Sequence, residues 1–368
     1  MKICVVGAGI VGLWVAAEAS KSGHKVELIE KYEIGHDKGS SHGDTRIFRT
    51  AYWEGSEYVA LAKQSIDMWE WLSTTGSERV FSKIGGYYVG KEESSLITGV
   101  MKSSQMYDLP IDTHSISDVL GAQAQEGITI SEDLAGVVYA DKALQTLKSL
   151  CIKMDVNVRE NTTEENLDSD VVVYCKGPWS VEIPRLANVL SSNRVYCHWF
   201  KHNAKSKLFE KVFLVQGLDG RVLYGMPVTS DIVKVGWHNY PIIPLRPGLS
   251  ENSSPNVYID DIKDALCNLL NTELVHIRSK GCYFTNSLDE NYIVDNIDEN
   301  KWVICGLSGH GFKFAPALAR NIVMAIDKTS EIEVINPFRL SRFANAVNTI
   351  PRTHVQTESL LLGKSWDI

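Results

Sequence analysis

The stretch KICVVGAGIVGLWVAAEASKSGHKVELIEK, residues 2–31, decides the fold of the amino-terminal part of this 368-residue chain. An apolar strand enters a glycine turn, an amphipathic helix stops at Gly23, and a second strand ends at the acidic residue Glu30. A strand, a helix and a strand in this order form a βαβ unit, whose strands lie parallel in one sheet. The stretch therefore predicts an α/β domain at the start of the chain.

Gly7, Gly9 and Gly12 form the pattern G-x-G-x-x-G between the first strand and the helix. The first glycine allows the tight turn, the second lets backbone N–H groups approach a pyrophosphate, and the third lets the helix pack on the strand. Glu30 stands where an acidic side chain accepts hydrogen bonds from a ribose diol. We interpret the unit as a dinucleotide site; the alternative is a glycine turn that serves helix packing alone.

Composition limits the partners of the chain. The formal net charge of −8 argues against a broad electrostatic grip on nucleic acid or on an anionic membrane. The seven cysteines are an odd number without a C-x-x-C pair, which favours a reducing compartment over a disulfide framework or a zinc site. No run approaches the roughly 18 apolar residues of a membrane span. We expect a cytoplasmic protein without a leader, a bound metal, a membrane contact or a nucleic-acid partner.

Beyond the βαβ unit, the chain alternates between helical and sheet patterns. Residues 57–72 carry apolar side chains at spacings of three and four, which predicts a helix. Residues 195–280 alternate apolar and polar side chains, as in an antiparallel sheet. Further strands are expected near 85–90, 135–141, 156–161 and 169–180, and residues 301–326 return to strand, glycine turn and helix. We expect a discontinuous nucleotide-binding domain of residues 1–80, 141–190 and 281–368, with a substrate-binding domain of residues 81–140 and 191–280 inserted into it.

The stretch SSHGDTRIFRTAY, residues 40–52, carries a histidine, an aspartate and two arginines soon after the nucleotide-binding unit. Taken by itself, it fits an exposed turn held by ion pairs between Asp44 and the arginines. It also fits an anion site, because a guanidinium binds a carboxylate through two parallel hydrogen bonds.

Four stretches together are more discriminating: VVGAGIVG (5–12), SSHGDTRIFR (40–49), KGCYFTNSLDENYIVD (280–295) and GLSGHGFKFAPALA (306–319). Their order and spacing resemble the family of monomeric sarcosine oxidase and N-methyltryptophan oxidase, within the D-amino-acid-oxidase-like flavoproteins. The resemblance covers nearly the whole chain. It implies a Rossmann-like, glutathione-reductase-like FAD domain, as in p-hydroxybenzoate hydroxylase-type flavoproteins, with an inserted antiparallel-sheet substrate domain.

The resemblance also implies the main roles at the flavin and the substrate. His42 and Arg46 match family positions near the flavin ring, and Lys234 matches a lysine that promotes electron transfer to oxygen. Arg49 and Lys313 match the pair that binds a substrate carboxylate.

Further positions follow from the same resemblance. Cys282 matches the cysteine that forms a thioether to the flavin 8-methyl group, and His238 matches a histidine that lines the substrate cavity. Other residues assigned to the substrate are Tyr52, Tyr224 and Phe284. Besides Arg46, Cys282 and Lys313, the positions assigned to FAD are Gly7, Gly9, Ile10, Val11, Gly12, Glu30, Lys31, Ser40, Ser41, Ile47, Val158, Gly177, Trp179, Gly309, His310 and Gly311.

The activity that the resemblance implies is that of a monomeric oxidase of secondary amines. The expected substrate is an N-methyl amino acid such as sarcosine, or a cyclic imino acid such as pipecolate or proline. A hydride equivalent passes from the C–H next to nitrogen to flavin N5, the imine hydrolyses, and O2 reoxidises the flavin to give hydrogen peroxide. Phe284 stands where the family often has a tyrosine, so the substrate side chain stays open.

Three alternatives stay open at this point. A flavin dehydrogenase would pass electrons to another acceptor, and a filled oxygen-activating position at Lys234 argues against it. A nicotinamide dehydrogenase would share the glycine pattern but would not be yellow. A binding or sensing module would have kept nucleotide affinity and lost catalysis.

Overall fold

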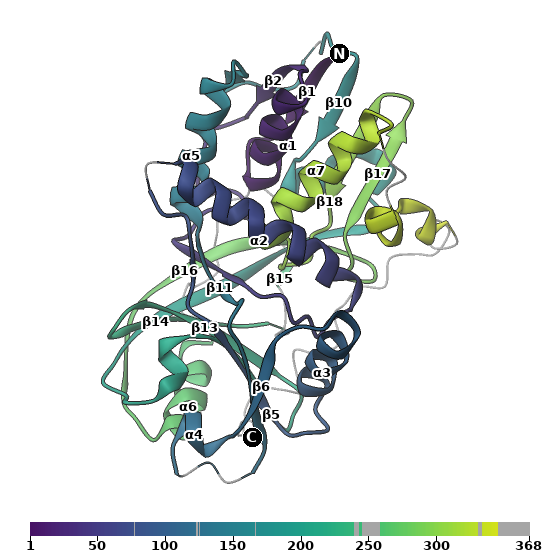
Figure 1. Ribbon diagram of the computed structural model, residues 1–368. Coiled ribbons are helices and arrows are strands. Elements are labelled where there is room, and N and C mark those ends of the chain that lie inside the picture. The colour runs from purple at the N-terminus through teal and green to yellow at the C-terminus, as the bar shows by residue number, and fades with distance from the viewer. Residues whose placement is uncertain are drawn as a thin grey trace.

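The computed structural model describes residues 1–76, 78–122, 124, 126–165, 167–238, 243–244, 258–329 and 333–344. Its strands form two large sheets in two parts of the molecule, with strands β11 and β16 running between those parts (Figure 1). A small three-stranded sheet completes the architecture.

The first large sheet contains the βαβ unit. Its order is β17-β18-β10-β1-β2-β9, and all neighbours are parallel except the edge strand β17. Side chains of a strand point alternately to its two faces, and accordingly Ile3 and Val5 pack under the helices while Cys4 and Val6 join a cluster on the other face. The strands are β1 (Lys2–Val6), β2 (Lys25–Ile29), β9 (Asn157–Arg159), β10 (Val171–Tyr174), β17 (Ile293–Asp298) and β18 (Lys301–Cys305).

Four helices cover one side of this sheet (Figure 1). Helix α1 contacts both α5 and α7, and α2 packs against α7. The rings of Trp14 on α1 and Trp69 on α2 meet edge to face with centroids 5.5 Å apart, and both are fully buried. The bounds are α1 (Ile10–Lys21), α2 (Glu57–Thr75), α5 (Ala140–Lys153) and α7 (Ala315–Ile326).

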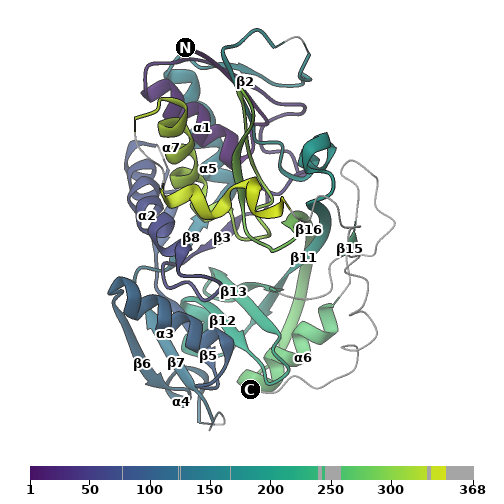
Figure 2. The ribbon, with the colours of Figure 1, turned by 90° about the vertical axis from the view of Figure 1, so that its right-hand side faces the viewer.

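The second large sheet is built around the long strand β11, which pairs with β16 in antiparallel register so that Val195 lies opposite Cys282 (Figure 2). Its remaining order is β15-β11-β14-β13-β12-β5-β7-β6. The strands are β5 (Gly86–Gly90), β6 (Ile111–Ser115), β7 (Ile128–Glu132), β11 (Leu190–His202), β12 (Val212–Gln216), β13 (Val222–Thr229), β14 (Ile232–Trp237), β15 (Ile243–Pro244) and β16 (Leu274–Ser287). Helices α3 (Ser95–Tyr107), α4 (Ser117–Leu120) and α6 (Ile259–Leu270) accompany it.

The small sheet places the charged stretch 40–52 between the two large ones. It has the order β3-β8-β4, and β3 contacts both β13 and the short helix η4. The strands are β3 (Thr45–Phe48), β4 (Phe81–Lys83) and β8 (Gly136–Tyr139). Short 3-10 helices span Gly177–Glu182, Pro184–Leu186, Lys207–Glu210, Phe312–Phe314 (η4), Glu333–Phe338 (η5) and Leu340–Phe343 (η6).

The predicted fold class is confirmed: a parallel sheet with a glycine turn after its first strand is joined to a largely antiparallel second sheet. The described pairs within residues 190–287 are all antiparallel, whereas β12 pairs in parallel with β5. Parallel pairing is possible there because a long stretch of chain separates these two strands. In the described residues, no helix combines the length and the apolar character that crossing a bilayer requires.

Candidate active site

A cavity of about 360 Å³ lies where β1, β2, β10 and β18 end. Its walls include Gly7 after β1, Glu30 after β2, Cys175 after β10 and Gly306 after β18, together with Cys282 from β16. Ligands of open α/β sheets bind at the carboxyl ends of the strands. The cavity therefore occupies the expected place and extends to the second sheet through β16.

The glycine turn forms one wall of the cavity through its backbone. Gly7 has φ +98°, and a Cβ there would lie 2.5 Å from the backbone oxygen of Cys175. A Cβ on Gly12 would lie only 1.8 Å from the carbonyl oxygen of Gly7, so this glycine serves the packing of α1 on β1. Helix α1 begins at the cavity without an acidic residue in its first turn. The Ile10 N–H donates to Ser41 Oγ (3.1 Å), and the other N–H groups of the first turn carry partial positive charge toward an anion.

Glu30 is buried at the end of β2 and accepts hydrogen bonds from the backbone N–H groups of Ala8 (2.7 Å) and Tyr32 (3.0 Å). Burial raises the pKa of this carboxyl, but the neighbouring His36 ring and the two N–H groups outweigh burial and hold its pKa below the ordinary value. The rings of Tyr32, His36 and Trp179 gather beside it. The carboxylate is thus fixed in its charged form at the cavity wall.

The β16 wall of the cavity combines Cys282 and Phe284 with the second glycine turn and Arg46. Gly309 has φ +80°, and a Cβ there would lie 2.2 Å from the Phe284 ring. The Arg46 guanidinium donates to four backbone carbonyls, those of residues 40, 42, 43 and 45. Burial raises the pKa of the Cys282 thiol to about 11, and Arg46 and Lys234 oppose that rise.

A buried ion pair lies in the loop that follows β3. The guanidinium Nη2 of Arg49 donates to Glu54 Oε1, while Arg49 Nη1 is buried without a hydrogen-bond partner among the described residues. The guanidinium also lies 3.9 Å from the centroid of the Tyr52 ring. Burial raises the pKa of Glu54, but Arg49 outweighs burial and lowers it to about 2. Both groups are therefore charged at neutral pH.

Glu132 at the end of β7 holds this loop in place. Its carboxylate accepts hydrogen bonds from the backbone N–H groups of Thr50 (2.6 Å) and Ala51 (3.2 Å), from the Thr50 hydroxyl and from Tyr88. Tyr88 also contacts the carbonyl of Ala51 (3.0 Å). A buried carboxylate that is fully hydrogen-bonded fixes its partners because leaving any of them unpaired is costly. Arg49 is positioned by this anchor.

Lys313, in η4, lies close to the same loop. Its Nζ is buried and donates to the Tyr52 hydroxyl (3.2 Å) and to the carbonyl of His310 (3.0 Å). Burial lowers the pKa of Lys313 well below its ordinary value, and the positive charge of Arg49 lowers it further. His238, directly after β14, lies with its Nε2 3.7 Å from Glu54 Oε1.

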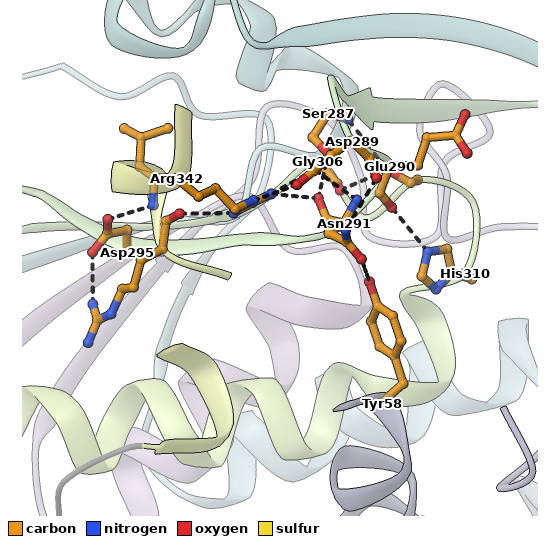
Figure 3. Close-up of polar contacts among 12 residues, drawn as sticks. Tyr58, Ser287, Asp289, Glu290, Asn291, Asp295, Gly306, His310 and Arg342 are labelled. Atoms are coloured by element: carbon orange, nitrogen blue, oxygen red, sulfur yellow. Dashed lines mark hydrogen bonds and ion pairs between the residues drawn. The ribbon is translucent and has the colours of Figure 1, made fainter. Parts of the chain in front are cut away.

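The His310 ring is held between two phenols and a backbone turn. Its Nδ1 lies 2.8 Å from the Tyr52 hydroxyl and 2.9 Å from the Tyr292 hydroxyl. Its Nε2 lies 3.4 Å from the carbonyl of Glu290 (Figure 3). A carbonyl only accepts, so this arrangement favours the tautomer with the proton on Nε2. Burial lowers the pKa of His310 to about 3, and the ring is neutral at pH 7.

The turn at residues 287–291 is fixed from the carboxyl-terminal side. Arg342 donates to both oxygens of Asp289, at 2.8 and 3.0 Å, and to the carbonyl of Asn291 (Figure 3). Asn291 in turn accepts a hydrogen bond from the Tyr58 hydroxyl on α2 (2.6 Å). Bidentate pairing of this kind fixes orientation as well as distance. The backbone that faces His310 is therefore rigidly placed.

Two further ionisable groups lie beside the Arg46 loop. Lys234 on β14 is buried and donates to the carbonyls of Gly43 and Thr45, both at 2.8 Å. Burial, and then the charge of Arg46, lowers the pKa of Lys234 to about 8. His42 is buried, and neither ring nitrogen has a hydrogen-bond partner within the part of the chain that the structure describes. Burial lowers the pKa of His42 to about 4.

The chain matches one protein family over most of its length. Residues 2–324 match the family DAO, described as FAD dependent oxidoreductase. The chain belongs to this family of FAD-dependent oxidoreductases.

Individual relatives span almost the whole chain. N-methyl-L-tryptophan oxidase of Yersinia pestis (strain Pestoides F) is 29% identical over 372 residues, covering 93% of this chain and 99% of that protein. L-proline dehydrogenase from P. horikoshii shares the fold with a TM-score of 0.77 at 18% identity, covering 94% of this chain and 98% of the other. NikD, an unusual amino acid oxidase essential for nikkomycin biosynthesis, has a TM-score of 0.76 at 17% identity, with coverage of 92% and 96%.

FAD fits the residues that line the cavity. The N-terminus of α1 and the backbone near Gly7 and Gly9 suit a pyrophosphate, and the ionised Glu30 suits a ribose diol. Predicted residues that line the cavity are Gly7, Gly9, Ile10, Val11, Glu30, Lys31, Ser40, Ser41, Arg46, Gly177, Trp179, Cys282, Phe284, Gly309 and Gly311.

The other predicted residues lie outside the cavity wall. Ile47 and Val158 pack against the hydrophobic core, and the Tyr224 hydroxyl contacts Cys197 Sγ at 3.3 Å. Gly12 lies where α1 packs against β1. The remaining predicted residues make the contacts described above: His42, Arg49, Tyr52, Lys234, His238, His310 and Lys313. Their roles stay predictions.

Sequence reasoning missed three residues that organise this region: Glu54, Glu132 and Tyr292. Glu54 follows Arg49 by five positions, and an acid that close to a buried arginine was the available signal. Glu132 is far from Arg49 in the sequence, and no local pattern connects them. Tyr292 reads as one more apolar residue ahead of a strand, although its hydroxyl contacts His310.

Proposed function

We propose that this flavoprotein is an oxidase of secondary amines whose substrates carry a carboxylate: an N-methyl amino acid such as sarcosine, or a cyclic imino acid such as pipecolate or proline. The observation that carries the proposal is the Arg49 guanidinium, which is buried, bound to a carboxylate of the chain itself and left with one nitrogen unpaired. The name of the relative from Yersinia pestis, N-methyl-L-tryptophan oxidase, supports an N-methyl amino acid as substrate.

The substrate carboxylate is proposed to bind between Arg49 and Lys313. Both groups are buried and both contact Tyr52, through its ring in one case and its hydroxyl in the other. Glu54 already shows that this guanidinium accepts a carboxylate partner. Because ion pairing is strong where water is excluded, removal of either side chain should weaken binding more for an amino acid than for a simple amine.

The substrate amine must be unprotonated when it reacts. An ammonium has no lone pair to stabilise the cation that forms as the adjacent C–H bond breaks. The positive charges of Arg49 and Arg46 disfavour an ammonium close to them, and His42, His238 and His310 are held neutral or have a lowered pKa. Rates should therefore rise with pH toward the depressed pKa of the bound amine.

Bound FAD would supply the two-electron acceptor, taking a hydride equivalent at N5 and returning the electrons to O2 as hydrogen peroxide. Cys282 is proposed to hold it through a thioether, since this thiol lines the cavity on β16. Arg46, also on the wall, would favour negative charge on the ring. Tyr224 and Phe284 would border the substrate on the β13 and β16 side.

Lys234 is proposed to assist oxygen. Its ammonium donates to two carbonyls of the Arg46 loop, which fixes it behind the residues that line the cavity. A buried cation stabilises the negative charge that oxygen develops as it is reduced, an effect of a few kcal/mol. We further propose that residues 81–140 and 191–280 form the substrate-binding domain, and that the protein is a cytoplasmic monomer.

A peroxide assay with matched substrates tests the function. Pipecolate and piperidine differ only by the carboxylate, as do N-methyltryptophan and N-methyltryptamine. The proposal predicts peroxide release from at least one of the acids and a kcat/KM at least 100-fold lower for its decarboxylated partner, by the loss of a buried charged contact. Equal rates with and without the carboxylate would refute the role of Arg49, and flavin reduction without peroxide would indicate a dehydrogenase.

A further inference from the structure

Lys313 makes two hydrogen bonds, neither of them to a charged partner, and the two N–H donors of an uncharged amine are enough for them. Its Nζ donates to two acceptors, the Tyr52 hydroxyl and the His310 carbonyl, and both are neutral. A neutral primary amine has two N–H donors and one lone pair, whereas an ammonium has three donors. Within the described residues, no ion pair joins Lys313 to a carboxylate, because Glu54 is bound to Arg49.

Apart from the Tyr52 and Phe314 rings, whose centroids lie 5.2 and 5.0 Å from its Nζ, the surroundings of Lys313 oppose a positive charge on it. Arg49 approaches from the loop after β3 and lowers the pKa of Lys313, while Glu54 from the same loop raises it to a smaller extent. Other ionisable groups on the packed elements include Tyr52, His238 after β14 and His310 before η4. Tyr58 on α2 and Arg46 on β3 pack against Phe314 and Phe312, the neighbours of Lys313 in η4. Burial is the largest effect and favours the uncharged form.

We propose that Lys313 is the proton acceptor for the substrate: the ammonium of the bound amino acid transfers one proton to Lys313 Nζ. The inference rests on the proposed function, since it assigns a role within that amino acid site. An N–H bond of the substrate breaks, an N–H bond forms on Lys313, and no electrons are exchanged. The same transfer yields the free amine that oxidation requires and an ammonium that pairs with the substrate carboxylate.

The charge balance explains why Lys313 can both accept the proton of the substrate and pair with its carboxylate. Arg49 and Glu54 neutralise each other, so an incoming carboxylate adds one negative charge to a buried region. A zwitterionic amino acid brings the proton that Lys313 needs to balance that charge. A carboxylate without an amine brings none, and Lys313 must then take a proton from the solvent.

Calorimetry of the holoenzyme with two unreactive ligands tests this directly. 2-Aminoisobutyrate has no hydrogen on the carbon next to nitrogen and is not oxidised, and isobutyrate is the same acid without the amine. Titration in two buffers of different ionisation enthalpy gives the protons exchanged. Between pH 7 and 9 we expect isobutyrate to take up about one proton per site, with affinity falling about tenfold per pH unit, and 2-aminoisobutyrate to exchange none.

Variants locate the proton. Lys313→Met and Lys313→Arg should both abolish the uptake, the second because a guanidinium is always charged. Uptake that persists in these variants, or no uptake by the wild type, overturns the assignment. If the methionine variant does not fold, the arginine variant and the wild-type pH dependence still decide.

The two proposals fail differently. Peroxide formation from an N-methyl or cyclic amino acid without proton uptake on isobutyrate binding would refute the Lys313 role and leave the function intact. Failure of both ligands to bind would refute the carboxylate site and the Lys313 role together.

Discussion

The cavity and the Arg49–Lys313 cluster are built in opposite ways. Glycine turns at Gly7 and Gly309 and the start of α1 bring backbone to the cavity wall. The cluster consists of buried ionisable side chains, of which Arg49 pairs with Glu54 and Lys313 donates to the Tyr52 hydroxyl. Rigid backbone can bind a cofactor that stays in place. Buried charged side chains need partners within the protein, because an unpaired buried charge is costly.

We expect the largest single loss of folded flavoprotein from a substitution in the first glycine turn. Gly12→Ala places a Cβ 1.8 Å from the Gly7 carbonyl oxygen, while Gly9→Ala meets only the Ser41 hydroxyl at 3.0 Å. We expect the first variant to give no folded yellow protein and the second to fold with about tenfold weaker FAD retention. Circular dichroism and flavin absorbance measure the two effects, and equal behaviour of the variants would contradict the distinction between packing glycine and cofactor glycine.

The next largest effect on activity is expected from a substitution of Arg49 in the Arg49–Lys313 cluster. Arg49→Met should lower kcat/KM for pipecolate by about 10³-fold or more, and should also destabilise the fold by about 3–5 kcal/mol because Glu54 is left as an unpaired buried charge. The double variant Arg49→Met, Glu54→Gln should regain much of the stability and none of the activity. Thermal melts and kinetics separate the two; recovery of activity in the double variant would show that Arg49 does not bind substrate.

Substitution of Lys234 tests whether its positive charge acts only in the reoxidation of the flavin by oxygen. Lys234→Met should slow flavin reoxidation by about 10²–10³-fold and leave anaerobic reduction by substrate largely intact. Lys201→Met is the matched control, because Lys201 lies on the neighbouring strand with an exposed side chain. Stopped-flow absorbance follows both half-reactions. Equal losses in the two half-reactions would contradict the assignment.

A smaller effect should appear with pH. The pKa of Lys234 is lowered to about 8, so its positive charge is lost as the pH rises through that value. The reoxidation rate constant should be highest below pH 8 and fall by about tenfold by pH 9. In Lys234→Met the rate constant should be low and independent of pH across this range. A wild-type rate that is flat from pH 6 to 9 would indicate another group.

The cavity and the Arg49–Lys313 cluster also differ in how far the sequence predicts them. The roles of Gly7 and Gly12 follow from spacing alone, because turn geometry and helix packing are local. The partner of Arg49 and the anchor at Glu132 depend on which strands become neighbours, and β7 reaches this loop only through the second sheet. The direction of the His310 ring, away from the cavity and toward Tyr52 and Tyr292, likewise depends on tertiary packing.

The proposed function places the flavin ring at the β16 wall beside Cys282, and acid precipitation of the purified protein tests that placement. We expect the yellow colour to stay in the wild-type pellet and, after proteolysis, in a peptide that contains Cys282. In Cys282→Ala the flavin should pass to the supernatant. Flavin that escapes from the wild type, or that stays bound in Cys282→Ala, would contradict the claim.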